Sequence, residues 1–527
     1  CTGGINASAA RIGERELREI HLPAMKACAD AGVDGVMAAY NEIDGVFCHA
    51  NRHLLTDILR DEMGFEGVVM ADGCAIDQLN VVTGDCVHSA AAALRAGVDI
   101  GLWDEAYGRL EEALENGYIT EEDIDRAVLR VLELKIKRGI FKHPLLDENQ
   151  KLEDYSYEKY PQALDIARES VVLLENRNQI LPLSKEQRKI AVIGPNADAV
   201  YNQLGDYSPQ VKREKCSTVL DGVRSYFGDN VVYARGCGVF EGTQEEQTEA
   251  VKLAEQSDIT ILVLGGSSSR FGEVSFDANG AAISEHGVSM DCGEGVDTSE
   301  LSLPIEQREL AEKIFATGSK VITVIIGGRA YALDTIAEKS DAVLYAFYPG
   351  MQGGKAIAEI LFGDVNPSGR LPVSLPRCSG QLPVYYNYKN SYRSMHYYNI
   401  PDGAAYTFGY GKCYTEFEYA DVSFVKEDNG VQVEMTIKNI GAQDGYAVPL
   451  VYIAGEQGSV VRRVKELKGF HKVWLKKGES TKVKILLPFE AFAVWDSEMK
   501  FTVEPGRVQI ILEELGQIVG SETLSLF

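Results

Sequence analysis

The sequence contains no long run of apolar residues, although hydrophobic residues make up 45% of its 527 positions. A helix that spans a bilayer needs about 18 or more consecutive apolar residues. Every apolar run in this chain is shorter, which excludes a membrane-spanning helix within the sequence. At this length we expect two to four domains, each large enough to bury its own core.

Positive charge is also scarce. Lys and Arg together number 52 against 78 Asp and Glu, which gives a net charge of −26. A strongly acidic chain repels nucleic acid and anionic membrane surfaces, so we expect neither as a partner. A neutral small molecule such as a sugar is compatible with this charge, and so is a surface that serves only solubility.

The sequence lacks the usual signatures of metal and nucleotide sites. Its ten cysteines form no C-x-x-C pair and no Cys/His cluster with metal-ligand spacing, so we expect no metal. The glycine pairs Gly265-Gly266 and Gly327-Gly328 form neither G-x-G-x-x-G nor a P-loop, so we expect no nucleotide cofactor. Scattered thiols of this kind are typical of reduced proteins, which favours a cytoplasmic location.

The most informative stretch runs from Gly32 to Asp77. Two apolar runs rich in β-branched residues, Val33–Ala39 and Gly67–Ala71, are typical of buried parallel strands. Residues 51–63 between them carry apolar residues at helical spacing, which predicts a β-α-β unit. Asp72 follows the second strand directly, where a (β/α)8 barrel places its catalytic residues. An Asp in such a position is also often a helix cap or an ion-pair partner.

The pattern YNEIDGV....N..LLTDILR.E.GF.G.V..D, from Tyr40 to Asp72, resembles the nucleophile region of glycoside hydrolase family 3, which contains β-glucosidases and β-xylosidases. The resemblance implies that Asp72 is the catalytic nucleophile and that Met37 and Tyr40 line the pocket for the released sugar. Family members often carry an aromatic residue directly after the nucleophile, whereas this chain carries Gly73. The resemblance therefore does not predict an aromatic ring at this position that could stack on a sugar beyond the first.

The resemblance continues along the chain and implies an α/β fold with three domains. These are the C-terminal part of a (β/α)8 barrel at 1–140, an α/β sandwich at 166–415 and a fibronectin type III-like β-sandwich at 416–527, with a charged linker at 141–165. The residue pattern agrees, because continuous apolar runs such as Ile259–Leu264 are typical of parallel strands. The short alternating segments after 416 are typical of a β-sandwich.

The predicted barrel is incomplete. The residues before the linker supply only about three strands, at 33–39, 67–71 and 97–102, whereas a (β/α)8 barrel needs eight. We therefore interpret the sequence as an N-terminally truncated form of a longer protein. In the resembled family, the missing part would carry residues that grip the non-reducing sugar.

Two predicted helices are specific enough to test. Residues 121–138 have helical spacing, with Thr120 as N-cap and Asp123 completing a capping box. A second helix is predicted at Arg168–Leu174, where the sandwich domain opens.

Hydrolysis with retention requires a second, protonated carboxyl group as general acid. The polar stretch from Gly265 to Leu303 offers Glu285 and Glu294. The segment GEGVD around Glu294, followed by Leu303-Pro304, resembles the acid/base loop of the bacterial β-glucosidase branch, and its glycines allow the backbone to approach a substrate. We assign this role to Glu294 and expect a dry environment that keeps it protonated.

On this resemblance we expect a retaining, exo-acting β-glycosidase that needs no cofactor and removes terminal β-D-glucosyl residues from a small carbohydrate substrate. A β-xylosidase of the same family and a non-catalytic carbohydrate-binding fragment are the alternatives. A β-N-acetylhexosaminidase is disfavoured, because that branch usually lacks the two C-terminal domains. The sequence leaves open whether the chain forms a homo-oligomer.

Overall fold

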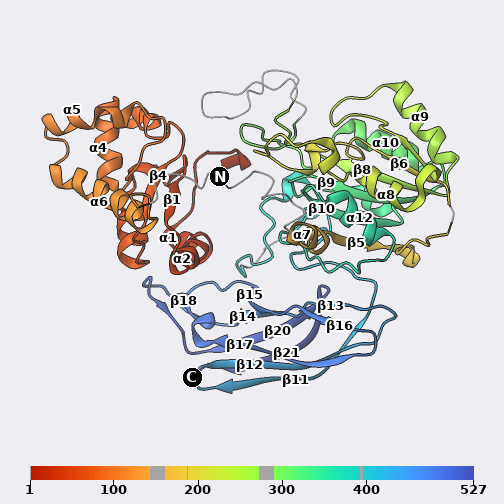
Figure 1. The fold of residues 1–527 in the computed structure, drawn as a ribbon. Helices are drawn as coiled ribbons and strands as arrows, with labels where there is room; N and C mark the ends of the chain where they lie inside the picture. Colours follow the sequence, from red (N-terminus) through yellow and green to blue (C-terminus); the bar gives the residue numbers. More distant parts are fainter. Residues whose placement is uncertain (1, 143–160, 187, 272–289, 392–395, 527) are drawn as a thin grey trace. The chain divides into compact units, whose positions relative to one another are not determined.

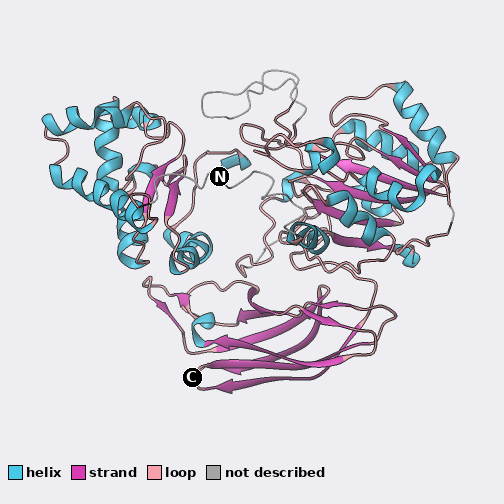
Figure 2. Ribbon diagram, in the orientation of Figure 1, coloured by secondary structure: helices cyan, strands magenta, loops and turns pink. Residues whose placement is uncertain are grey.

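The computed structural model of the chain (Figure 1) describes residues 2–142, 161–186, 188–271, 290–391 and 396–526. Both helices and strands occur up to α12 (Gly353–Leu361), and strands dominate the remainder (Figure 2). Among the residues described, no helix combines the length and the apolar character that crossing a bilayer requires.

The chain divides into two compact units. The first comprises Cys1–Tyr155 with Phe276–Ala281, and the second comprises Ser156–Ser275 with Ala282–Phe527. Each unit has hydrophobic clusters of its own.

The first unit contains the predicted β-α-β unit. Strands β1 (Gly35–Ala38) and β4 (Val68–Ala71) pair in parallel along their full length, and helix η4 (His53–Glu62) connects them. Leu55 and Leu59 on the helix are buried against the outer face of these strands, as their helical spacing predicts. The β-α-β prediction is therefore confirmed.

The third barrel strand, expected at 97–102, is present only as one parallel bridge between Ile100 and Met70. Backbone hydrogen bonds join Asp99 and Ile100 to Val69, but the pairing does not extend into a regular strand. The Asp99 side chain itself accepts the Val69 N–H at 2.8 Å, so a carboxylate replaces part of the expected backbone ladder.

Helices complete the first unit. The predicted capping box is confirmed: Thr120 N–H donates to Asp123 at 3.0 Å, and Asp123 N–H donates to the Thr120 hydroxyl at 3.4 Å. The elements of this unit, besides those given above, are η1 (Thr2–Gly4), α1 (Glu14–Glu16), η2 (Leu17–His21), α2 (Leu22–Asp30), β2 (Glu42–Ile43), β3 (Val46–Phe47), η3 (Cys48–Ala50), η5 (Asp77–Leu79), α3 (Asn80–Thr83), α4 (Cys86–Ala96), η6 (Ala106–Arg109), α5 (Leu110–Glu115) and α6 (Glu121–Lys137).

The second unit opens with a six-stranded sheet in the order β5-β10-β9-β8-β6-β7. All neighbouring strands pair in parallel except β5 and β10, which are antiparallel, so the predicted parallel sheet gains one antiparallel edge. The strands are β5 (Val172–Asn176), β6 (Ile190–Ile193), β7 (Val231–Ala234), β8 (Ile259–Gly265), β9 (Lys320–Ile326) and β10 (Ala342–Phe347).

Alternate residues of this sheet face two different helical layers, because successive side chains on a strand point to opposite faces. Ile261 and Val263 belong to the cluster that contains α8 and α12, whereas Leu262 and Leu264 belong to the cluster that contains α9, α10 and α11. The result is the expected α/β sandwich. Its remaining helices are α7 (Gln162–Ser170), α8 (Val219–Phe227), α9 (Gln244–Glu255), α10 (Ile305–Phe315) and α11 (Asp334–Lys339), with the short turns η9 (Arg177–Gln179), η10 (Tyr201–Gln203), η11 (Arg213–Lys215), η12 (Gly228–Asn230) and η13 (Ser379–Gln381).

The helix predicted at Arg168–Leu174 is wrong in its second half. Helix α7 ends at Ser170, and β5 begins at Val172. The side chains of Val172, Leu173 and Leu174 are fully buried in the sheet, so tertiary packing overrides the local helical pattern. Helix α7 also begins inside the predicted linker, most of which lies outside the described residues.

The C-terminal part is a β-sandwich, as predicted. Strands β11 (Phe417–Glu427), β12 (Gly430–Asn439) and β17 (Ser480–Pro488) form one sheet, and β15 (Glu466–Phe470), β14 (Leu450–Gly455), β20 (Arg507–Glu514) and β21 (Gln517–Ser525) form the other. The short elements are β13 (Gly445–Ala447), β16 (Val473–Leu475), η14 (Phe489–Phe492), β18 (Val494–Trp495) and β19 (Phe501–Thr502).

Candidate active site

Asp72 lies directly after β4, at the C-terminal end of a barrel strand. Its side chain is half-buried, and its Oδ1 accepts the Gly73 N–H at 2.8 Å. Its own backbone N–H donates to Nε2 of His49 at 3.4 Å. These two contacts fix the orientation of the Asp72 carboxyl group at the end of the strand.

His49 packs behind Asp72 with only 1% of its surface exposed. Burial lowers the pKa of its imidazole to about 4, although the nearby Asp72 charge acts in the opposite direction. At neutral pH the ring is therefore uncharged, and its Nε2 is free to accept the Asp72 N–H.

Met37 lies within β1, and Tyr40 follows shortly after the end of that strand. Tyr40 donates its hydroxyl to the Gly73 carbonyl at 2.7 Å, so the structure joins it to the residue that follows Asp72. Met37 is 55% exposed and is in register with Met70, on the strand face that turns away from the helices. Both placements are compatible with the expected pocket-lining roles, which stay predictions.

Trp103 occupies the space that an aromatic side chain at position 73 would need. A Cβ built on Gly73 would lie 3.1 Å from Trp103 Cε3 and 3.5 Å from the Tyr40 hydroxyl. The Trp103 side chain is 72% exposed, and its backbone adopts a left-handed conformation with φ of 61°. An indole ring from the next segment of the barrel therefore lies beside the nucleophile position.

Glu294 belongs to the second unit, on a tight turn between Gly293 and Val296. Gly293 has φ of 133°, and a Cβ there would lie 2.8 Å from the Met290 methyl, so only glycine suits this position. The Glu294 backbone N–H donates to Asp206 Oδ2 at 3.1 Å. The turn thus holds Glu294 by its backbone and leaves its side chain 22% exposed.

Buried polar contacts fix the start and the end of this turn. Asp291 accepts the Ser267 N–H at 2.8 Å and the hydroxyl of Tyr331. Arg329 donates to the carbonyls of Asp291 at 2.6 Å and Val296 at 2.7 Å. Burial raises the pKa of Asp291, and the Tyr331 hydroxyl opposes that shift by stabilising the carboxylate.

An arginine lies close to the Glu294 side chain. The Oε2 of Glu294 lies 3.6 Å from Nη2 of Arg270. The guanidinium also contacts Asp206 through its Nε and stacks over the Tyr207 ring with 3.6 Å to the centroid. Arg270 is thus shared between two carboxylates. The alternative acid, Glu285, lies outside the described residues.

Sequence reasoning missed the residues that support the two carboxyl groups. None of them belongs to a recognisable motif, and each reaches its partner only through the fold. The one available signal was Gly73 itself, since a missing side chain beside a nucleophile leaves room for a neighbour. The missed residues are His49, Trp103, Asp206, Arg270, Asp291 and Arg329.

Comparison with known protein families identifies all three domains. Residues 1–134 match the glycosyl hydrolase family 3 N-terminal domain, residues 171–414 match the family 3 C-terminal domain, and residues 447–514 match a fibronectin type III-like domain. A partial barrel with a carboxylate at a strand end, followed by these two domains, defines the class as glycoside hydrolase.

Comparison with individual proteins agrees with this class. The chain is 33% identical to a periplasmic beta-glucosidase of Salmonella typhimurium, over 97% of this chain and 70% of that protein. It is also 33% identical to a beta-xylosidase of Formosa agariphila, over 99% of this chain and 73% of that protein. The crystal structure of a beta-glucosidase from Listeria innocua in complex with isofagomine superposes with a TM-score of 0.91 at 32% identity, covering 100% of this chain and 73% of that one. The chain belongs to glycoside hydrolase family 3 and is an exo-glycosidase of the β-glucosidase and β-xylosidase group.

Lowering the pH should destabilise the native protein more than a His49→Gln variant. The pKa of His49 is about 4 in the folded state against 6.5 for the free side chain, so below about pH 6.5 the unfolded chain binds a proton that the folded chain does not. Stability present above this pH is lost progressively as the pH falls towards 4. At about pH 5 the burial of His49 lowers the free energy of unfolding by about 2 kcal/mol relative to its value at neutral pH.

Urea unfolding of the first unit at about pH 7 and about pH 5 measures this difference. His53→Gln is the matched control, because the His53 side chain is 52% exposed. Equal pH dependence in the native protein and in His49→Gln would contradict the assignment of a buried neutral ring.

Proposed function

We propose that this protein is a retaining β-glucosidase in which Asp72 is the nucleophile and Glu294 is the acid/base. The observation that carries the proposal is the placement of Asp72 at a barrel strand end, with a backbone N–H on its carboxylate and a neutral His49 behind it. Such a carboxyl group is positioned by rigid elements and is half-exposed, as attack on an anomeric carbon requires.

Retention results from two displacements by carboxyl groups about 5–5.5 Å apart. In the first, an Asp72 oxygen bonds to the anomeric carbon while the glycosidic C–O bond breaks, and Glu294 gives its proton to the departing oxygen. In the second, the Glu294 carboxylate takes a proton from water, the water oxygen bonds to the anomeric carbon, and the ester bond to Asp72 breaks. Both residues return to their starting states.

Arg270 fits the second displacement better than the first. After Glu294 has released its proton, the guanidinium 3.6 Å away stabilises the resulting anion. The turn therefore supports an acid that must exist in both protonation states during one cycle.

Glucose is the preferred sugar in this proposal, and xylose is the alternative. Beta-glucosidases occur among both the sequence relatives and the structural neighbours, one of them in complex with laminaribiose. The beta-xylosidase relatives support the alternative at similar identity. Comparing kcat/KM on 4-nitrophenyl β-glucoside and β-xyloside decides between them, since one hydroxymethyl group is worth about 1–3 kcal/mol of discrimination.

Asp72→Asn should abolish turnover while the fold persists, because the amide keeps the shape of the side chain and cannot carry its negative charge. Activity on an aryl β-glucoside is the readout, with circular dichroism as the check on folding. Asp61→Asn, an exposed helical position, is the matched control. A loss below about tenfold, or ~1.4 kcal/mol of barrier, would remove Asp72 from the nucleophile role.

Glu294→Ala should separate substrates by their leaving groups. A general acid contributes about 10²–10⁴-fold when the departing alcohol is a poor leaving group. We expect hydrolysis of a disaccharide to collapse, whereas the first step on dinitrophenyl β-glucoside, which needs no protonation, should persist. Added azide should rescue the second step and yield a β-glycosyl azide.

Glu285→Ala and Glu300→Ala are the comparison variants for this experiment. Both should resemble the native enzyme on the two substrates. If azide rescue appears in Glu285→Ala instead, the acid/base role belongs to that residue and the assignment to Glu294 is wrong.

Trp103 supplies the stacking surface that Gly73 cannot. In Trp103→Ala we expect KM for a β-linked disaccharide to rise about tenfold, because a lost aromatic contact is worth ~0.5–1.5 kcal/mol. Turnover of β-glucosyl fluoride, whose leaving group is a single atom, should change little. Trp103→Phe retains a ring and should recover most of the effect. Equal losses on both substrates would show that Trp103 does not contact the leaving group.

A further inference from the structure

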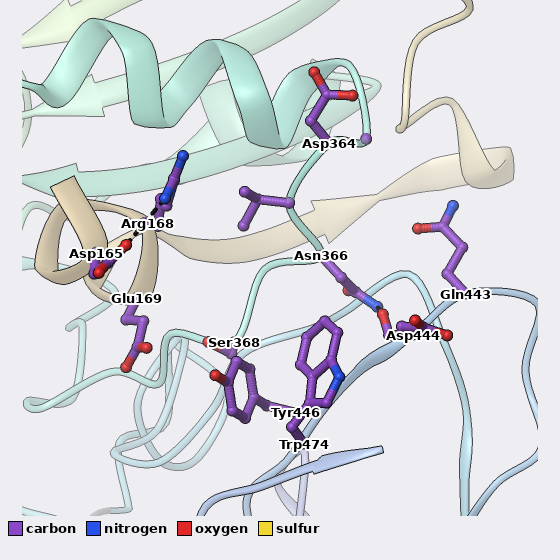
Figure 3. A pocket seen from close by; sticks show the side chains of 12 residues that line it. Asp165, Arg168, Glu169, Asp364, Asn366, Ser368, Gln443, Asp444, Tyr446 and Trp474 are labelled. Carbon is purple, nitrogen blue, oxygen red and sulfur yellow. Dashed lines mark hydrogen bonds and ion pairs between the residues drawn. The ribbon is translucent and has the colours of Figure 1, made fainter. Parts of the chain in front are cut away.

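A second cavity lies within the second unit, where the α/β sandwich borders the β-sandwich (Figure 3). Its volume is about 670 Å³, within the range of ligand pockets. Helix α7, the segment after α12 and the turns around β13 and β16 each contribute to its wall. None of its lining residues belongs to the candidate active site.

Two aromatic residues form one wall of this cavity. Tyr446 on β13 and Trp474 on β16 are paired in register, and their ring centroids lie 4.8 Å apart at an interplanar angle of 65°. Lys472 lies 4.4 Å from the Tyr446 centroid and covers that ring, whereas Trp474 is 45% exposed. An exposed indole held by two strands is a rigid platform for a ligand.

The cavity is rich in hydrogen-bond acceptors, but most of its carboxylates are already paired with a cation. Arg168 bonds to Asp165 at 2.9 Å and to Glu359, which lies outside the lining, and Lys472 bonds to Glu169 at 2.6 Å. Arg168 and Lys472, the cations at this wall, are therefore already paired with carboxylates. Each carboxylate still offers further lone pairs, because an ionised carboxyl group has about four acceptor sites.

Asn366 makes the cavity rigid. Its Nδ2 donates to the Asp444 carbonyl at 2.9 Å, and its Oδ1 accepts the Tyr414 N–H at 2.8 Å. The first of these bonds reaches the β-sandwich from the segment that follows α12. The Asp444 carboxylate accepts the Lys477 N–H at 2.8 Å, which fixes it at the rim. The wall residues are thus preorganised before any ligand binds.

We propose that this cavity is a second carbohydrate-binding site, which takes a neutral oligosaccharide through Trp474 and the carboxylate rim. Anionic ligands are disfavoured because Asp165, Glu169, Asp364 and Asp444 line the wall. Cations are disfavoured because Arg168, Lys472 and Lys185 already pair with three of these groups. Sugar hydroxyls can donate to carboxylates, and the apolar face of a pyranose can lie on an indole.

The test measures binding of cellotetraose in an Asp72→Asn background, so that no hydrolysis occurs and the result does not depend on turnover. We expect one binding component to weaken about tenfold or more in Trp474→Ala and to persist in Trp474→Phe. Phe470→Ala is the matched control, since Phe470 is 66% exposed on the same β-sandwich but does not line the cavity. Without the Asp72 change, Trp474→Ala should keep native kcat/KM on 4-nitrophenyl β-glucoside.

Three outcomes would overturn the proposal. Cellotetraose binding that is the same in Trp474→Ala and in its parent excludes the site, as does equal weakening in Phe470→Ala. Binding of tetramethylammonium that depends on Trp474, without sugar binding, would identify a cation site instead. Unfolding temperatures of all variants establish that Trp474→Ala is folded. If the native enzyme proves inactive on glucosides, the binding result still stands or falls by itself.

Discussion

The carboxylate of Asp99 holds together the elements that position Asp72, the proposed nucleophile. It contacts Arg60 of η4 at 2.7 Å, Arg130 of α6 at 2.8 Å and the backbone N–H of Val69 in β4 at 2.8 Å, and its side chain is 1% exposed. Breaking a buried pair by removing one partner costs about 3–5 kcal/mol, because it leaves an unpaired charge. One side chain therefore connects two helices to the strand that ends at Asp72.

Asp72 and Glu294 are held in different ways, and the difference matches the roles proposed for them. Asp72 follows a strand whose neighbours are fixed by buried ionic and apolar contacts, so its position varies little. Glu294 lies on a glycine-flanked turn and contacts a shared arginine, Arg270. A nucleophile keeps one charge state until it bonds to carbon, whereas an acid/base must change its protonation twice per cycle. Rigid placement suits the first role, and an adjustable electrostatic environment suits the second.

The sequence was sufficient for features that depend on local pattern. The β-α-β unit, the capping box at Thr120 and the β-sandwich strands all follow from periodicity or from residues a few positions apart. It was insufficient where contacts between distant residues decide the outcome. Val172–Leu174 becomes a strand because the sheet buries it, and Ile100 makes only one bridge because the Asp99 side chain takes a backbone partner. Motif resemblance located Asp72 and selected Glu294, but no motif indicated the arginine beside Glu294.

The three tryptophans of the chain differ in how much of their ring surface is exposed to solvent. Trp495 packs against Phe501 with 5.4 Å between ring centroids and is half-buried, as expected of a large aromatic side chain. Trp103 and Trp474 are instead 72% and 45% exposed, each beside polar groups that can accept or donate hydrogen bonds. What distinguishes these two rings is their surroundings, because Trp103 lies against Gly73 beside Asp72 and Trp474 lines the cavity described above. A sugar, with one apolar face and a rim of hydroxyls, matches both surroundings.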